Sequence, residues 1–179
     1  NPLNEMEHNP IQTMLDEHEL ICQTEEIIER LDGVWKTDAN RYESNVTTLV
    51  EFFREYADGY HHRKEEDVLF PEIKNHPDFV LQEIIDEFEQ HHEDFRDYTG
   101  EIEAALSEKD YEKSFKELNN YLQDLLDHIA AENDELFVLA ETLMSEEELE
   151  TIYFKFKDID LELGEERKRE LEEKIATFT

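Results

Sequence analysis

The chain has 179 residues, and its 50 acidic side chains against 17 basic ones give a net charge of −33. A charge of this sign and size repels phosphate backbones and anionic lipids, which argues against nucleic acids and membrane surfaces as partners. A single cysteine excludes an internal disulfide and indicates a reducing compartment, so we expect a cytoplasmic protein.

Two stretches of the N-terminal half carry apolar residues at helical spacing. The first begins with Pro10, directly after the capping residue Asn9, and runs to about residue 31. The second covers about residues 40–70, and we expect Pro71 to end this helix or to kink it.

The pattern continues with two more amphipathic stretches, over about residues 81–106 and 111–143. The links between the stretches are short and polar, and the whole chain contains only 4 glycines and 4 prolines. Long amphipathic helices joined by short links form antiparallel bundles. We therefore predict an all-α fold, an antiparallel up-down four-helix bundle formed by residues 1–144.

An additional C-terminal helix is expected after the bundle, because Ser145 and Glu148 have the spacing of a capping box. It extends to about residue 175, with Gly164 as a candidate interruption, and residues 145–179 thus form a predicted helical extension. We expect it to pack on the bundle or on a partner, such as a second copy of the chain in a homodimer. This expectation rests on its mixed charges and on the aromatic residues Tyr153, Phe154 and Phe156.

The second and fourth stretches repeat one motif. In both, a glutamate follows a histidine by four residues: His61 and Glu65 in one, His128 and Glu132 in the other. A Leu-Phe pair then follows each histidine by eight residues. Since residues four apart share one helix face, each His–Glu pair can bind one cation or bridge two.

Histidines also occur on the apolar faces of the other two stretches. His18 lies on the apolar face of the first. In the third, His92 continues one apolar series and His91 another, so the spacing leaves both open. His62 aligns instead with acidic residues on a hydrophilic face, and we expect it to face solvent or to contact the ligands from outside.

Carboxylates buried in an apolar bundle must be neutralised by a proton or a cation, and neutral imidazoles are ready metal ligands. An ordinary core residue is the better interpretation of any one inner histidine. Four converging helices with two matching glutamates favour a metal site. Imidazole and carboxylate without thiolate suit iron, manganese or zinc. Six ligands exceed the four of a zinc site, and two carboxylates placed to bridge indicate two cations, for which we expect iron.

These segments resemble the hemerythrin-like, or HHE cation-binding, domains, whose helices carry the pattern H, HxxxE, H, HxxxE. Residues 61–71, HHRKEEDVLFP, are similar to the family's HHxKEEDxLFP segment, and residues 128–133, HIAAEN, to its HIxKEN segment. Residues 92–98, HEDFRDY, resemble its HExxRxY run, which favours His92 over His91. Residues 14–19, MLDEHE, look like its first-helix motif, and the resemblance extends over about residues 10–143.

The resemblance implies two non-haem iron ions, bridged by the two glutamates and by an oxo or hydroxo group. The implied ligands are His18, His61, Glu65, His92, His128 and Glu132. In the oxygen-carrying hemerythrins the third helix offers HxxxH and the fourth HxxxxD. This chain differs, with Phe88 and Arg96 one turn from His92 and Asn133 at the aspartate position. One iron is thus expected to be open, or bound by water or a tyrosine; Tyr121 lies on the correct face, as a packing residue or as a ligand.

Several functions are compatible with such a centre. The first is a protein that binds or senses O2, NO or iron. The alternatives are a di-iron enzyme with catalase-like or oxidase activity, acting on O2 or peroxide, and a protein of iron storage or homeostasis. A ferritin-type carboxylate site is disfavoured, because it needs two inner Glu-x-x-His pairs and only Glu89-x-x-His92 fits.

Overall fold

Helices are the only regular secondary structure in residues 7–178, the part of the chain that the structure, a computed structural model, describes. The prediction of an all-α fold is confirmed for these residues. The first half contains α1 (Pro10–Cys22), α2 (Thr24–Arg30), η2 (Val34–Lys36), α3 (Ala39–Phe52), η3 (Phe53–His62), η4 (Glu65–Leu69) and α4 (Phe70–Lys74). The second half contains α5 (Gln82–Ser107), α6 (Tyr111–Ala131), η5 (Glu132–Leu136), α7 (Phe137–Leu143), α8 (Glu146–Leu163) and α9 (Glu165–Ala176).

The first predicted helix is present but divided at Gln23, between α1 and α2. Its start is as predicted, since the Asn9 side chain accepts hydrogen bonds from the backbone N–H groups of Ile11 and Gln12. At the break, the Thr24 hydroxyl donates to the Ile21 carbonyl at 2.6 Å, a side-chain bond that competes with the helical pattern.

The second predicted helix runs without interruption from α3 through η3 and η4 into α4. Within it η3 and η4 are π-helical, with hydrogen bonds between residues five apart instead of four. Pro71 does not end this helix, which continues to Lys74. Pro71 lies inside this continuous helix, directly after the π-helical η4, so the backbone N–H that proline lacks is missing from the helical hydrogen-bond pattern at this point.

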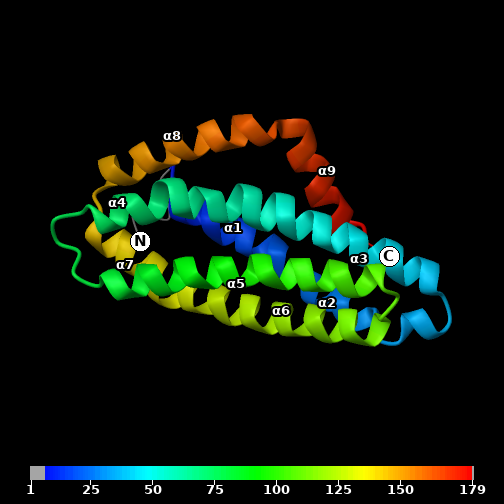
Figure 1. Cartoon of the computed structure of the whole chain (residues 1–179). Helices are drawn as coiled ribbons and strands as arrows, with labels where there is room; N and C mark the ends of the chain where they lie inside the picture. The colour runs from blue at the N-terminus through cyan, green and yellow to red at the C-terminus, as the bar shows by residue number, and fades with distance from the viewer. Residues whose placement is uncertain (1–6, 179) are drawn as a thin grey trace.

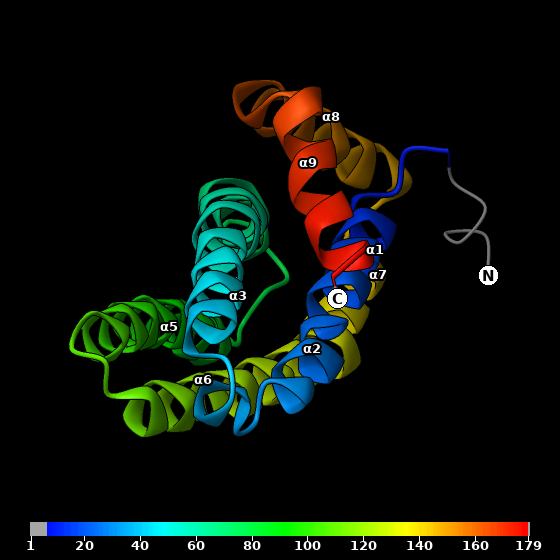
Figure 2. The ribbon, with the colours of Figure 1, turned by 90° about the vertical axis from the view of Figure 1, so that its right-hand side faces the viewer.

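The bundle helices surround a common interior, seen along their axes in Figure 2, and α5 and α6 pack together along their lengths (Figure 1). The capping box of Ser145 and Glu148 is present at the start of α8, as predicted. Gly164 separates α8 from α9 with a φ of 86°, a value that favours glycine. Both helices lie against the bundle, α8 on α1, η3 and η4, and α9 on α1. The domain boundary at residue 144 and the homodimer stay predictions.

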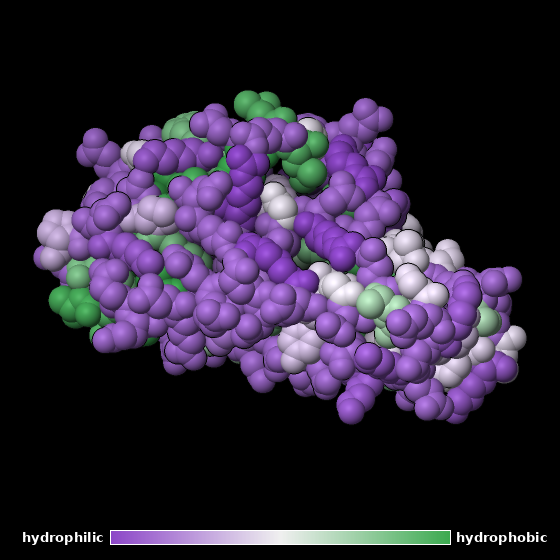
Figure 3. All heavy atoms as spheres, viewed as in Figure 1, coloured by the Kyte–Doolittle hydropathy of each residue, from purple (hydrophilic) through white to green (hydrophobic). Residues whose placement is uncertain are grey.

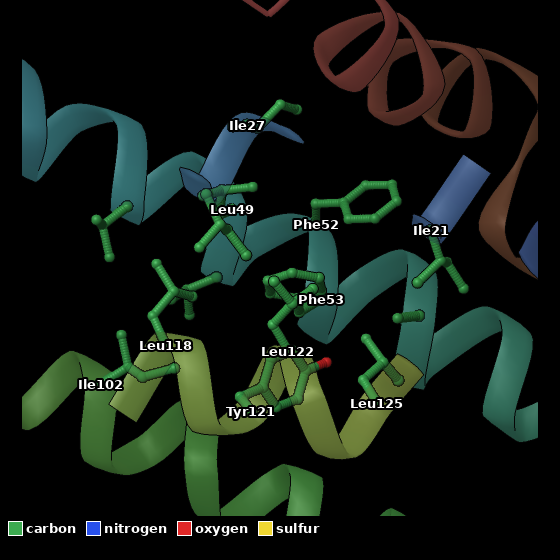
Figure 4. Close-up of a cluster of buried hydrophobic side chains, with 14 of the residues drawn as sticks. Ile21, Ile27, Leu49, Phe52, Phe53, Ile102, Leu118, Tyr121, Leu122 and Leu125 are labelled. Atoms are coloured by element: carbon green, nitrogen blue, oxygen red, sulfur yellow. The ribbon is translucent and has the colours of Figure 1, made fainter. Parts of the chain in front are cut away.

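Apolar side chains of the interior form two clusters along the bundle. One of them contains Phe53 and Tyr121, whose rings pack edge to face and are labelled in Figure 4. The predicted metal-binding positions lie between the two clusters on each bundle helix. On α1, for example, His18 lies between Met14 of one cluster and Ile21 of the other. The fold therefore holds polar side chains in the middle of an otherwise apolar interior.

Hydrophilic side chains cover most of the face shown in Figure 3, in keeping with the large acidic excess. Among the described residues, no helix combines the length and the apolar character that crossing a membrane requires.

Candidate metal centre

Five histidines and two glutamates meet between the two apolar clusters, and none is more than 2% exposed. They form two groups, and within each group the ligand atoms all lie within 4.8 Å of one another. The first group is His18, His61, Glu65 and Glu132; the second is His62, Glu65, His92 and His128. All six predicted residues are thus brought together, and His62 is a seventh residue of the cluster. Glu65 belongs to both groups.

The atoms that face the centre of this cluster are buried and have no hydrogen-bond partner within the described part of the chain. They are both carboxylate oxygens of Glu65 and Glu132 and the Nε2 atoms of His18, His61, His92 and His128. Each such atom would cost roughly 1–3 kcal/mol if nothing bound it. A cation that accepts their lone pairs removes this cost, so the donor set fits a metal.

The two glutamates each lie between imidazoles of different groups. Glu65 Oε1 is 3.3 Å from His61 Nε2 and 3.6 Å from His92 Nε2. Glu132 Oε1 is 3.3 Å from His18 Nε2 and 3.0 Å from His128 Nε2. Two donors bound at right angles to one ion, each about 2.1 Å from it, are about 3 Å apart. These spacings therefore suit ligands of shared cations.

The outer nitrogen of each histidine is held by a second side chain. Four Nδ1–H groups donate to oxygen: His18 to Asn133 (2.7 Å), His61 to Glu17 (2.8 Å), His62 to Asp58 (3.1 Å) and His92 to Glu66 (3.0 Å). His128 Nδ1 lies 2.9 Å from His91 Nδ1. A proton fixed on Nδ1 leaves the Nε2 lone pair free to bind a metal, so these partners select the tautomer that metal binding needs.

Burial keeps most of these imidazoles uncharged. It lowers the pKa of His18 to about 4, that of His62 to about 3 and that of His128 to about 2. Burial also lowers the pKa of His61, but the hydrogen bond to Glu17 and the nearby negative charge of Glu65 outweigh it and raise this pKa to about 9. Burial works against ionisation of Glu65, but its contacts with His61 prevail and hold its pKa well below the usual range. The cluster thus contains ionised carboxylate and neutral imidazole, the forms that bind cations.

The family model of the hemerythrin HHE cation-binding domain matches residues 9–140, about three quarters of the chain. The chain belongs to the hemerythrin HHE cation-binding family. No curated protein and no solved structure gives a significant match. The resemblance stated from the sequence motifs is confirmed, and the buried His/Glu cluster agrees with a metal-binding function. The matched residues end before α8, so α8 and α9 lie outside the family domain.

Of the two places predicted for His62 in this hemerythrin-like centre, the solvent-facing one is wrong. His62 is 2% exposed, and its ring stacks on that of His92 at 3.8 Å between centroids. The prediction used α-helical spacing, but His62 lies in the π-helical η3, where a turn contains more residues. The supposed hydrophilic face instead packs on α5, where Asp58 and Glu66 both bind Arg96. The adjacency of His61 and His62 was a signal in the sequence that both could lie near the centre. The pattern of apolar residues, however, does not reveal a π-helix.

Burial and side-chain contacts distinguish between the alternatives that the sequence left open for His91 and His92, for Tyr121 and for Glu89. His92 is fully buried in the second group, whereas His91 is 35% exposed and contacts His128 from outside. Tyr121 is in neither group, and its ring packs on Phe53 at 4.6 Å between centroids (Figure 4). Glu89 pairs with Lys74 at the surface, so the one ferritin-type pair does not form.

Two cavities border the second group of this HHE domain. One, of about 270 Å³, is lined by His62 together with Phe95 and Tyr121. The other, of about 330 Å³, is lined by His128 and His91 with three aspartates: Asp94, Asp124 and Asp127. A small molecule therefore has space beside the imidazoles of this group.

Proposed function

We propose that the chain is a non-haem di-iron protein in which the two groups each hold one ion. Glu65 and Glu132 bridge the ions, the first group supplies His18 and His61, and the second supplies His62, His92 and His128. The observation that carries this proposal is the set of buried, unpartnered donor atoms at the centre of the cluster. Iron is favoured because the donors are imidazoles and carboxylates without thiolate, with carboxylates placed between two ions.

We infer that the centre binds or senses a small oxidant such as O2 or NO. A pair of iron ions, when bound, supplies electrons reversibly to such molecules. The protein keeps the imidazoles of His18, His62 and His128 neutral. It also fixes Nδ1 protons through side-chain partners and surrounds the cluster with apolar side chains that limit the access of water. The cavity beside His62 has the rings of Phe53 and Phe95 in its wall together with the charged Arg54, Asp58 and Arg96, and it supports binding of a small molecule there.

A peroxide-consuming enzyme is the second candidate. The observation in its favour is Tyr121, whose side chain lines the same cavity as His62. Burial raises the pKa of the Tyr121 hydroxyl, so the hydroxyl keeps its proton at neutral pH and can donate a hydrogen bond to a molecule in this cavity.

The test is to load the protein with ferrous iron without oxygen and then add O2, NO or peroxide in small steps. We expect about two irons per chain and a near-ultraviolet absorption change that saturates at a fixed ratio of added molecule to iron pairs. Repeated consumption of peroxide with return of the starting spectrum would identify the enzyme instead. A protein that retains no iron and shows no spectral response would contradict both candidates.

A further inference from the structure

The side chain of Lys64 is fully buried, one residue before the bridging candidate Glu65. Its ammonium group contacts three oxygens: Glu17 Oε2 at 2.7 Å, the Tyr60 hydroxyl at 2.7 Å and Asp160 Oδ1 at 2.8 Å. A buried ammonium is strongly destabilising unless it is paired with carboxylates. Lys64 therefore fixes the positions of the two acidic side chains that neutralise it.

Glu17 connects this buried cation to the metal centre. One of its oxygens accepts the hydrogen bond of Lys64, and the other accepts the Nδ1–H of His61 at 2.8 Å. Glu17 is only 5% exposed, so no bulk water competes for these bonds. The orientation of the His61 ring thus depends on where Lys64 holds Glu17.

Asp160 is the last residue in the series of contacts that runs from His61 through Glu17 and Lys64, and it lies in a different part of the molecule. It lies on α8, outside the residues that match the HHE domain. Its carboxylate binds Lys64 and also accepts the Tyr60 hydroxyl at 2.5 Å. Without Asp160, Glu17 would be the one carboxylate among residues 7–178 in contact with Lys64, and the ammonium would draw Glu17 away from His61.

We propose that α8 is part of the metal centre, with Asp160 and Lys64 as positioning residues that hold Glu17 against His61. A cation bound by His61 fixes the orientation of the His61 ring. Through the contacts described above, the ring then fixes the positions of the Glu17, Lys64 and Asp160 side chains. Binding of the cation and docking of α8 therefore stabilise one another, since such an effect is reciprocal. This inference rests on the proposed cation site, and it makes the C-terminal extension a reporter of metal occupancy.

The test compares Asp160→Asn with Glu162→Gln in the full-length chain. Both variants remove one negative charge from α8, but Glu162 pairs with the exposed Arg63 and has no contact with Glu17 or Lys64. Ferrous iron affinity is measured by competition with a chelator, and backbone hydrogen exchange of α8 is measured with and without iron. In the wild type and in Glu162→Gln, we expect iron to slow exchange in α8.

For Asp160→Asn we expect iron affinity to fall about tenfold, as for other groups that orient metal ligands, and the iron-dependent slowing in α8 to disappear. Asp160→Glu keeps the charge and is expected to restore both. If Asp160→Asn does not fold, Tyr60→Phe removes a hydroxyl bonded to Lys64 and Asp160 and should produce a smaller loss of both. Equal behaviour of Asp160→Asn and Glu162→Gln would overturn the role of α8 while leaving the cation site intact. A wild type that binds no iron would overturn the site itself.

Discussion

We expect Glu65→Gln to abolish iron binding without unfolding the protein. Glu65 is the only residue among those described that belongs to both groups, and an amide cannot bridge two cations as a carboxylate does. Without metal, the variant should remain within about 1 kcal/mol of the wild type, because the substitution preserves shape and His61 still has Glu17 as a partner. The substitution therefore separates the role of Glu65 as a ligand from its role in the fold.

The measurement is calorimetric unfolding of wild type and variant, each with and without iron, together with metal analysis. Iron at about a hundred times its dissociation constant stabilises the wild type by about 2.7 kcal/mol. In a chain of this length that raises Tm by about 5–10 °C. We expect no rise for Glu65→Gln. Asp67→Asn is the matched control, because Asp67 lies in the same π-helical segment and pairs with Arg63 at the surface. An iron-dependent rise of normal size in Glu65→Gln would exclude Glu65 as a bridging ligand.

For His62→Ala we expect the loss of one of the two proposed cations and the retention of the other. His62 belongs to the second group alone, and the donors of the first group, including His18 and His61, do not depend on it. Under saturating iron we expect metal content to fall from about two ions per chain to about one.

The control for His62→Ala is His91→Ala, because His91 also lies beside the second group but contacts His128 only at its outer nitrogen. At saturating iron this variant should retain both ions. If His62→Ala still binds two ions, His62 is not a ligand and lies outside the ligands, as α-helical spacing predicts. Another donor would then have to complete the second group.

The positions of most site residues were predictable because the helices of the bundle are regular there. Each bundle helix buries one apolar stripe, so a histidine on that stripe must point inward, as His18 and His92 do. The repeated His-x-x-x-Glu motif predicts that His128 and Glu132 share one helix face, and their side chains are 3.0 Å apart where α6 passes into η5. The sequence motifs and the family match agree because both depend on these regularly spaced, inward-facing residues.

The errors have local causes. The π-helical turns of η3 and η4 change the angle between successive side chains, and a pattern of apolar residues does not encode them. His62 was misplaced for this reason. The contact between Lys64 and Asp160 joins residues far apart in the chain and depends on how α8 lies across the bundle. Helical periodicity predicts that α8 has an inner face, but not which buried charge it meets.

The central claim is that iron binds among the buried imidazoles and carboxylates, and anomalous diffraction from crystals grown with ferrous salt tests it most directly. Data collected on both sides of the iron absorption edge should show two peaks in each chain. We expect one peak among His18, His61, Glu65 and Glu132, and the other among His62, Glu65, His92 and His128. Absence of anomalous density from this cluster in iron-soaked crystals, or these side chains turned away from one another toward solvent, would contradict the account.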